Sequence, residues 1–392
     1  MLFTLEALHA KHGDALLLHY GTPAKPRLAV IDGGPAGVYA MSLRPRLEQL
    51  QAARSPGKPL PVRCLMISHI DDDHIHGVLD LLNEMVEAAD NNESPLCQIE
   101  TLWHNSFDDI LGNSSDELTA AVSSSVKAAA AGLPLPPNLP LQHFESALVA
   151  ASVNQGRQVR DRAVRLKIKP NAEMSGKLVM GERTSKTNIA MKDGLKFTVL
   201  GPLRHRVEAL QEEWDAKLKA MKKAKPGEAQ AIAAEFLDES VFNLSSIVVL
   251  AEAGGKKMLL TGDARGDDVM AGLKAAKLLK EGRFHVDILK VPHHGSDRNV
   301  ATEFFQQVTA DHYVISADGK HGNPDPPTLK MLTEARGGDR YTIHLTNLPN
   351  PPHKAKAFFE KDRVDNDRKY TLKVRDNGAL SLRIDLGEPL AG

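Results

Sequence analysis

The segment Ser68–Gly77 constrains this chain most, because histidines stand on both sides of an acidic triplet within it. Six of its ten residues carry an imidazole or a carboxylate that can bind a metal ion. The apolar run over residues 62–67 predicts a buried strand before the segment, and residues 78–82 predict a helix after it. Side chains between a strand end and a helix start often form an active site. The alternative, a polar turn with capping aspartates, rarely has histidines at both ends.

The composition is that of an ordinary soluble protein and argues against some functional classes. With 392 residues, 42% hydrophobic and 25% charged, the chain has room for one large domain with insertions or for two domains. A net charge of −1 argues against a strongly electrostatic nucleic-acid binder, although a local basic patch stays open.

Nothing in the sequence indicates export or membrane insertion. No apolar run approaches the roughly 18 residues of a membrane span. Residues 1–6 lack the basic region and the cleavage site of a signal peptide. Cys64 lies in the predicted apolar strand, so a packing role suits it better than a disulfide with Cys97. We therefore expect a cytoplasmic protein with no membrane partner.

Two further strand ends carry side chains of the same kinds. Asp263 follows the apolar run 257–260, and His293 and His294 follow the run 286–291. Strand ends at one edge of a sheet converge, and a metal ion needs ligands at about 2.0–2.2 Å from several directions. A two-metal site also needs a bridging carboxylate, which Asp263 suits. The alternative for Asp263 is a helix cap, and the alternative for His293 and His294 is a buried structural pair. A chain without a metal site would need both of these and the polar turn at residues 68–77 to be true at once.

The order of elements predicts the fold class. Strands and helices alternate through one long unit, which is typical of an α/β (α+β) sandwich of two sheets with helices outside. We expect a single domain over residues 1–392 with helical insertions at about 106–165 and 203–237. The insertions are expected to contain a helix at 123–131 and a long charged helix at 206–236 that Pro226 interrupts. A C-terminal β segment at about 338–392 is expected to end in a pair of strands, 370–374 and 380–384, around the turn at 376–378.

The polar clusters together resemble a known family. The pattern His69-x-Asp71-x-Asp73-His74, with residues 259–263 and 289–296, is similar to the metallo-β-lactamase fold. Within it the chain most resembles the ComEC-type branch, the hydrolase domain of DNA-uptake proteins and its free-standing relatives. Residues 13–15, 31–34 and, more loosely, 322–326 share this resemblance, which covers most of the chain apart from the insertions and residues 347–369. It implies an αββα sandwich with helical insertions.

The resemblance also implies a ligand set for two metal ions. His69 and Asp71 would bind one ion, Asp73 and His74 the other, and Asp263 would bridge them.

The remaining polar residues receive supporting roles from the same resemblance. His294 would complete the ligand set of the second ion, the one bound by Asp73 and His74, and His293 would face the substrate. Asp32 would orient a ligand histidine from outside the ligand set, and Asp14 would be structural.

Two departures from the wider fold affect the metal. Asp71 stands where most of the fold has histidine, so the site is richer in oxygen. Zinc stays the expected ion, and manganese is the alternative. The wider fold also places a ligand histidine at the end of the strand that here ends in residues 199–202, and this chain has none there. Three residues are weak substitutes for this missing ligand histidine: His104, His205 and Asn243. Separately, Asn323 stands where the fold often has a histidine before a proline.

The leading functional hypothesis is a metal-dependent hydrolase with two divalent ions as cofactors. The two ions would activate the attacking water molecule, and Asp73 would orient this water. His293 would protonate or stabilise the leaving group. A phosphodiester of nucleotide, nucleic-acid or phosphocholine type is the preferred substrate, because the resembled branch includes nucleases and phosphocholine esterases.

Alternative functions stay open. One is an acyl, thioester or lactam hydrolase, and another is a non-catalytic binding module with a vestigial site. Basic runs at 157–162 and 217–225 favour a nucleic-acid substrate, but neither contains an aromatic residue for base stacking. A small-molecule substrate therefore stays open beside nucleic acid, and a protein partner stays open as well.

Overall fold

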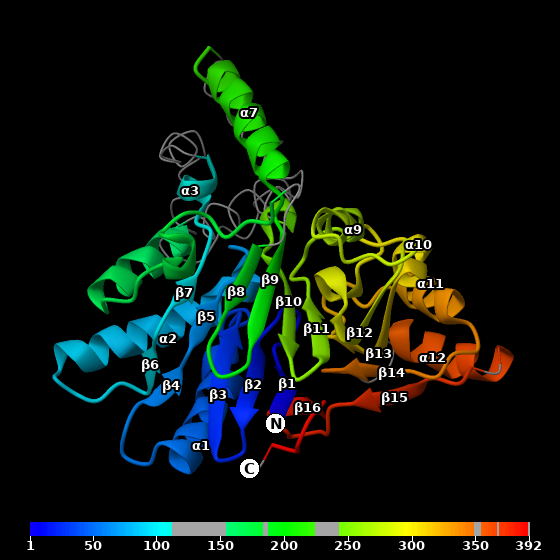
Figure 1. The fold of residues 1–392 in the computed structure, drawn as a ribbon, viewed down its shortest axis with the longest axis horizontal. Helices are drawn as coiled ribbons and strands as arrows, with labels where there is room; N and C mark the ends of the chain where they lie inside the picture. The colour runs from blue at the N-terminus through cyan, green and yellow to red at the C-terminus, as the bar shows by residue number, and fades with distance from the viewer. Residues whose placement is uncertain (112–153, 183–186, 224–242, 349–353, 367, 391–392) are drawn as a thin grey trace, which may run out of the picture.

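The computed structural model describes residues 1–111, 154–182, 187–223, 243–348, 354–366 and 368–390. Within this part of the chain, most strands belong to two large sheets that pack face to face (Figure 1). Helices cover the outer face of each sheet, so the layers run helix, sheet, sheet, helix. The predicted α+β sandwich is confirmed.

The first sheet has six strands, and its centre comes from the first 31 residues. β1, β2 and β3 form an antiparallel meander, in which Leu5 lies opposite Leu18. β5 and β7 extend it in parallel. Its order is β16 (Ser381–Asp385), β1 (Leu2–Leu8), β2 (Leu16–Thr22), β3 (Lys25–Ile31), β5 (Cys64–Met66) and β7 (Leu102–Trp103).

The second sheet has eight strands and changes direction in the middle. β8 to β11 are antiparallel, and β11 to β15 are parallel, with a described helix between each two successive parallel strands. Its order is β15 (Thr371–Val374), β14 (Thr342–Leu345), β13 (Val308–Ile315), β12 (Phe284–Lys290), β11 (Lys256–Leu260), β10 (Val248–Ala253), β9 (Lys196–Gly201) and β8 (Thr187–Ala190).

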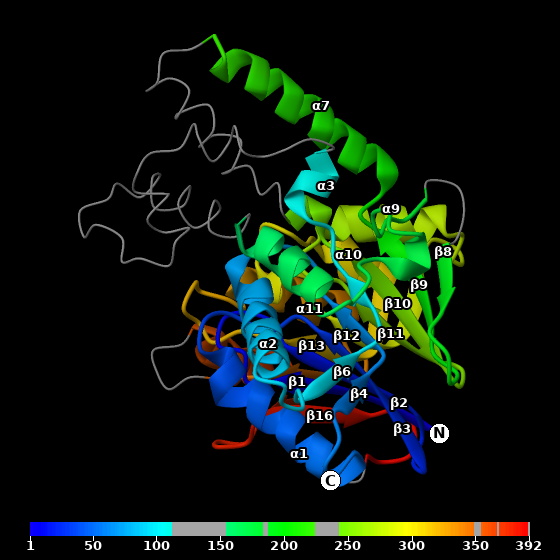
Figure 2. The ribbon, with the colours of Figure 1, turned by 90° about the vertical axis from the view of Figure 1, so that its left-hand side faces the viewer.

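Three groups of buried apolar side chains hold the layers together. The group between the sheets includes Trp103 and Phe197, whose ring centroids are 5.4 Å apart. A second group joins the first sheet to α1 (Arg44–Arg54) and α2 (Asp72–Asp90), which stand in front of it in Figure 2. The third joins the second sheet to its own helices, α9 (Gly266–Ala275), α10 (Thr302–Gln307), α11 (Pro326–Arg336) and α12 (Lys354–Asp365).

Two strand predictions were wrong in detail. Residues 62–67 do not form one strand, because β4 (Leu60–Val62) pairs with β6 (Cys97–Ile99) in a separate ribbon and only β5 joins the first sheet. The strands at 370–374 and 380–384 do not pair with each other. β15 closes the second sheet, and β16 crosses to pair with β1. The turn between them therefore links the two sheets, and apolar pattern alone does not show such a switch.

The insertions are described only in part. Residues 154–165 are helical, α3 (Phe107–Leu111) precedes them, and α7 (Arg204–Met221) projects away from the sandwich in Figures 1 and 2. The predicted helix at 123–131 and the break at Pro226 lie outside the described residues. Among the described helices, none is both long and apolar enough to cross a membrane.

A buried ionic network fastens α1 to the first sheet. Glu6, 1% exposed, accepts hydrogen bonds from Arg46 Nε at 2.7 Å and from His19 Nε2 at 2.9 Å. Burial favours the neutral acid, but the bond from His19 and the charge of Arg46 outweigh it and lower the pKa of Glu6 to about 2. Burial lowers the pKa of His19, so its ring is neutral and Nδ1 accepts from Arg54 Nη2 at 3.0 Å.

The Glu6→Gln variant is expected to lose about 2 kcal/mol of stability at neutral pH, the range for a hydrogen bond to a charged group. The folded pKa lies below the ordinary value of 4.5, so the contribution is present above pH 4.5 and disappears as the pH falls toward 2. Urea unfolding of both proteins from pH 7 to pH 2.5 measures it. Glu48→Gln, at a side chain 45% exposed, is the control. A difference that does not change with pH would contradict the prediction.

Candidate metal centre

The candidate site lies where strands of both sheets end at one edge of the sandwich. Asp32 follows β3 and His69 follows β5, which run parallel in the first sheet. Asp263 follows β11 and His294 follows β12, which run parallel in the second. Since carboxyl ends of parallel strands share an edge, four distant segments meet here. The amide of Ile247 donates to the carbonyl of Ser68 at 2.7 Å and joins the sheets beside the site.

Helix α2 begins six residues earlier than the apolar pattern predicts. It starts at Asp72 instead of Val78, so Asp73 and His74 occupy its first turn. Acidic side chains are favourable there, because the N-terminal end of a helix carries partial positive charge. The pattern failed because the first turn is polar. Asp73 and His74 face the site instead of a hydrophobic core.

One half of the site is a compact group of three side chains. His74 Nε2 lies 3.2 Å from His294 Nε2 and 3.3 Å from Asp263 Oδ1. His294 Nε2 lies 3.3 Å from Asp263 Oδ2. Two ligands at 2.0–2.1 Å from a tetrahedral ion would stand about 3.3–3.4 Å apart. The spacing of these atoms therefore fits one metal ion.

The other predicted ligands adjoin this group. His69 Nε2 is 3.3 Å from Asp71 Oδ2 and 3.9 Å from Asp263 Oδ2. Asp73 Oδ2 is 3.4 Å from His294 Nε2, and Asp73 Oδ1 is 3.8 Å from His74 Nε2. The structure thus brings all six predicted ligands together, with Asp263 next to both halves. Their division between two ions stays a prediction.

Two buried ligand atoms lack a hydrogen-bond partner among the described residues. They are His69 Nε2 and Asp263 Oδ1, on side chains that are at most 3% exposed. Buried polar atoms nearly always have a partner, and a cation would supply one here. Nitrogen and carboxylate donors together suit zinc and manganese. The residues present fit a bound metal, and the identity and number of ions stay predictions.

The charges of the group are strongly coupled. Burial would lower the pKa of His74 and His294, but the carboxylate of Asp263 and its acidic neighbours outweigh it and raise both pKa values well above the ordinary value. Burial would raise the pKa of Asp263, yet the two imidazoles hold it well below its usual range. Both ligand histidines would therefore release protons on binding a metal ion.

Neighbouring groups fix the orientation of both ligand histidines. His74 Nδ1 lies 2.9 Å from Asp32 Oδ2, and the same carboxylate accepts hydrogen bonds from the amide and hydroxyl of Ser68, each at 2.7 Å. His294 Nδ1 donates to the carbonyl of Ser316 at 2.9 Å. Both Nε2 atoms then point into the site. The role of Asp32 in orienting a ligand stays a prediction, and this is the contact it requires.

Sequence reasoning missed part of this surrounding layer. Asp14 was expected to be structural, but its carboxylate joins His74, Asp263 and His294 in one group whose ligand atoms lie within 4.8 Å of one another. Its Oδ1 is 3.5 Å from His294 Nδ1, so it faces the side of the ring away from Nε2. Lys290, which pairs with Asp14, was not singled out. Its signal was present, since it is a charged residue inside an apolar strand.

His293 and His294 differ in exposure. Their side chains are 27% and 3% exposed, which agrees in direction with His293 facing substrate and His294 binding metal. Both have a left-handed backbone, with φ of 46° and 53°, which is strained for residues other than glycine. His293 Nδ1 lies 2.7 Å from Asn299 Oδ1. Their roles stay predictions.

Of the three substitutes for the missing histidine, the structure places Asn243 beside the site. Its Nδ2 is 3.5 Å from His293 Nδ1, and its Oδ1 has no partner among the described residues. His104 is buried against Gly156, where burial lowers its pKa to about 4. His205 is exposed at the start of α7.

The Asn243→Ala variant is expected to weaken, about tenfold, the binding of the ion predicted at His69 and Asp71, which is the lower range for a residue around a metal site. The second ion should be retained, because its ligands are untouched. Mass spectrometry of native protein after dialysis measures the ratio of metal to chain. His104→Ala and His205→Ala should keep the wild-type ratio, and loss of an ion in either of them alone would contradict the assignment.

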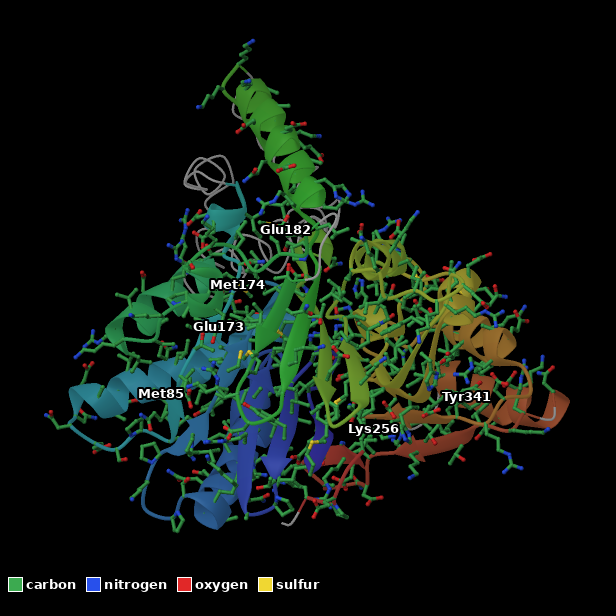
Figure 3. All side chains as sticks on the ribbon, viewed as in Figure 1. Met85, Glu173, Met174, Glu182, Lys256 and Tyr341 are labelled. Atoms are coloured by element: carbon green, nitrogen blue, oxygen red, sulfur yellow. The ribbon has the colours of Figure 1, made fainter. Side chains whose placement is uncertain are left out.

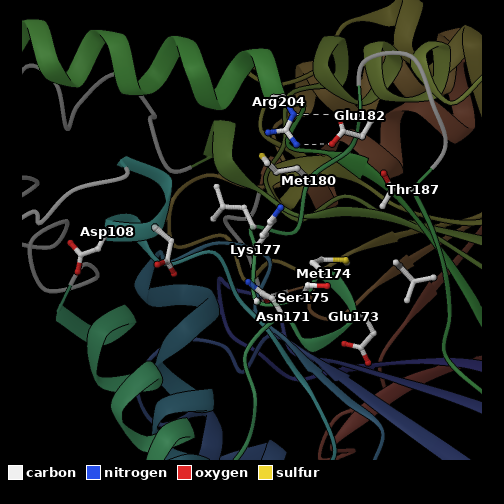
Figure 4. Close-up of a pocket in the computed structure, with 14 residues that line it drawn as sticks. Asp108, Asn171, Glu173, Met174, Ser175, Lys177, Met180, Glu182, Thr187 and Arg204 are labelled. Atoms are coloured by element: carbon white, nitrogen blue, oxygen red, sulfur yellow. Dashed lines mark hydrogen bonds and ion pairs between the residues drawn. The ribbon is translucent and has the colours of Figure 1, made fainter.

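The structure has one hollow at the metal centre and another beside the predicted insertions. The smaller, about 60 Å³, opens onto the metal centre between His12, Asp73, His293 and Lys320. The larger, about 980 Å³, lies along the segment that includes Glu173, Met174 and Glu182 (Figure 3), and the Arg204–Glu182 ion pair closes one side of it (Figure 4). It shares no lining residue with the metal centre.

Comparisons with known proteins give one partial match in sequence. A stretch of 95 residues is 35% identical to ComE operon protein 3 of Bacillus subtilis (strain 168). It covers 24% of this chain and 12% of that protein, so the match concerns a small part of the relative. No protein-family model matches the chain.

Solved structures add a weak likeness. A protein of unknown function from Enterococcus faecalis V583 aligns with 96% of this chain and 78% of its own, at 11% identity and a TM-score of 0.29. A likeness at this level does not define a shared fold.

Proposed function

We propose that this protein is a metallo-hydrolase of the metallo-β-lactamase type, in its ComEC-like branch, and that it cleaves a phosphodiester. The observation that carries the proposal is the buried group of His74, Asp263 and His294, spaced as ligands of one ion. The partial match to ComE operon protein 3 supports the choice of branch.

The six clustered residues would hold the metal, with His69 and Asp71 on one side, Asp73, His74 and His294 on the other, and Asp263 between them. Bound divalent ions would lower the pKa of a water molecule and polarise the phosphoryl oxygen. The chain itself supplies orientation, since Asp32 and the carbonyl of Ser316 fix the two histidine rings.

We assign proton transfer to His293. Burial lowers its pKa, so the ring is neutral near pH 7. Its Nδ1 donates to Asn299 Oδ1, which leaves Nε2 as the free acceptor, 3.6 Å from Asp263 Oδ2. Nε2 would take a proton from the attacking water and return it to the leaving alkoxide.

The predicted basic runs give little support for a nucleic-acid substrate. Arg157 pairs with Asp108 at 2.9 Å and Arg160 with Asp109 at 3.0 Å, so much of the run at 157–162 is neutralised within the protein. A small phosphodiester is therefore the favoured substrate class. Detection of tight single-stranded DNA binding at low salt would reverse this preference.

Hydrolysis of bis(p-nitrophenyl) phosphate by metal-loaded protein tests the proposal, with metal content measured on the same sample. The His69→Ala variant should lose activity, because it removes a buried ligand. Nitrocefin and an acyl thioester, assayed in parallel, test the alternative of an acyl or lactam hydrolase. A protein that binds no metal, or that stays fully active as His69→Ala, would refute the proposal.

A further inference from the structure

Lys290 is a fully buried cation directly behind the metal centre. Its side chain is 1% exposed at the end of β12, and Nζ forms an ion pair with Asp14 Oδ2. The same Nζ lies 3.8 Å from Asp263 Oδ1 and donates to the carbonyl of Gly262 at 3.2 Å. Burial would lower its pKa, but Asp14 and Asp263 outweigh this and raise the pKa above its ordinary value. The ammonium is therefore charged.

The position of this charge calls for an explanation. A permanent cation close to a metal site repels the metal ion and opposes its binding. Asp14 lies between the ammonium and the ligand rings, since its Oδ1 is 3.5 Å from His294 Nδ1 and its Oδ2 is 4.0 Å from His74 Nδ1. Asp14 and Lys290 together form a neutral pair next to the ligands, so the repulsion is largely cancelled.

Without a metal ion, the difficulty is the negative charge of the buried carboxylates. Asp14, Asp32 and Asp263 are each at most 2% exposed, and three buried carboxylates so close together repel one another and destabilise a fold unless cations lie beside them. In the part of the chain that the structure describes, the other groups that pair with Asp14 and Asp263 are histidines. Ligand histidines must be neutral when a metal is bound, whereas the lysine keeps its charge in both states.

We propose that Lys290 is a positioning residue that holds Asp14 and Asp263 in place before a metal ion binds, so that the acidic site stays assembled in the metal-free protein. Asp14 has the complementary task of screening Lys290 from the ion. This inference rests on the proposed metal centre and does not depend on which substrate the protein cleaves.

Removing the lysine charge tests the first part. Lys290→Met should lower the melting temperature measured in EDTA by several degrees, and saturating zinc should recover most of the loss. The shift in melting temperature that zinc produces should therefore be larger than in the wild type. Lys256→Met, which removes an exposed lysine paired with Asp287, is the matched control and should leave the zinc shift unchanged. An unchanged zinc shift in Lys290→Met would overturn the proposal.

Removing the screening carboxylate tests the second part and does not require Lys290→Met to fold alone. Asp14→Asn exposes the ligands to the lysine charge, so zinc affinity, measured by competition with a chelator, should fall about 10–100-fold. The double variant Asp14→Asn/Lys290→Met should bind zinc more tightly than Asp14→Asn. Equal affinities in these two variants would overturn the proposal. Absence of phosphodiester turnover alone would count against the proposed function and leave this result standing.

Discussion

Replacing Asp263 by asparagine is expected to weaken divalent metal binding more than about 100-fold and to reduce phosphodiester hydrolysis to background. Loss of a residue that only supports a ligand costs about 10–100-fold in affinity, so loss of a central ligand should exceed that. Both Asp263 oxygens lie within 3.3 Å of a ligand histidine, one next to His74 and the other next to His294. Asparagine keeps the shape and removes the charge.

Metal content by mass spectrometry and zinc affinity by chelator competition measure this effect. Asp267→Asn is the matched control, because Asp267 is 55% exposed in the first turn of α9 and pairs with Arg265. It should retain metal and activity. Wild-type zinc affinity in Asp263→Asn would show that the six clustered residues are not the metal ligands.

Replacing Gly77 by alanine is expected to destabilise the fold by about 3 kcal/mol, at the upper end for overpacking. A Cβ on Gly77 would lie 2.0 Å from the carbonyl oxygen of Gly33, which is backbone and cannot swing aside. The gain in helix propensity from glycine to alanine is only about 1 kcal/mol. The start of α2 would have to move, together with the hydrogen bond from the amide of Gly33 to the carbonyl of His74, now 2.8 Å.

Urea unfolding of the metal-free protein measures the loss, and zinc titration shows whether His74 is displaced. Gly338→Ala is the control, because a Cβ there would meet nothing within 4 Å. It should be neutral or slightly stabilising. If Gly77→Ala proved as stable as the wild type, the close approach of α2 to the end of β3 would be wrong.

The sequence predicted the fold class and the meeting of the ligands because both leave local signals. Apolar runs that end in histidine or aspartate mark strand ends, and Asp263 and His294 were found this way. The start of α2 was missed because a polar first turn, with Asp73 and His74, has no apolar periodicity. The split of β4 from β5 depends on which neighbours each strand pairs with, and that is a tertiary property.

The layer around the ligands was the hardest to predict. Asp14 lies before β2 and Lys290 at the end of β12, so their pairing depends on how the two sheets face each other. Sequence spacing carries no information about such a contact. Asn243 was open as one of three candidates, and the structure places it beside His293 where spacing could not.

The contact between His74 and His294 joins residues 220 positions apart, one from the helix that packs on the first sheet and one from the end of a strand in the second sheet. No partly folded chain can therefore present the complete ligand set, and a metal ion that needs it would bind only after the two layers have docked. Such an ion stabilises the native state without stabilising the transition state for folding. Its effect would thus be kinetic: the protein would unfold more slowly with metal, while the time needed to fold would stay the same.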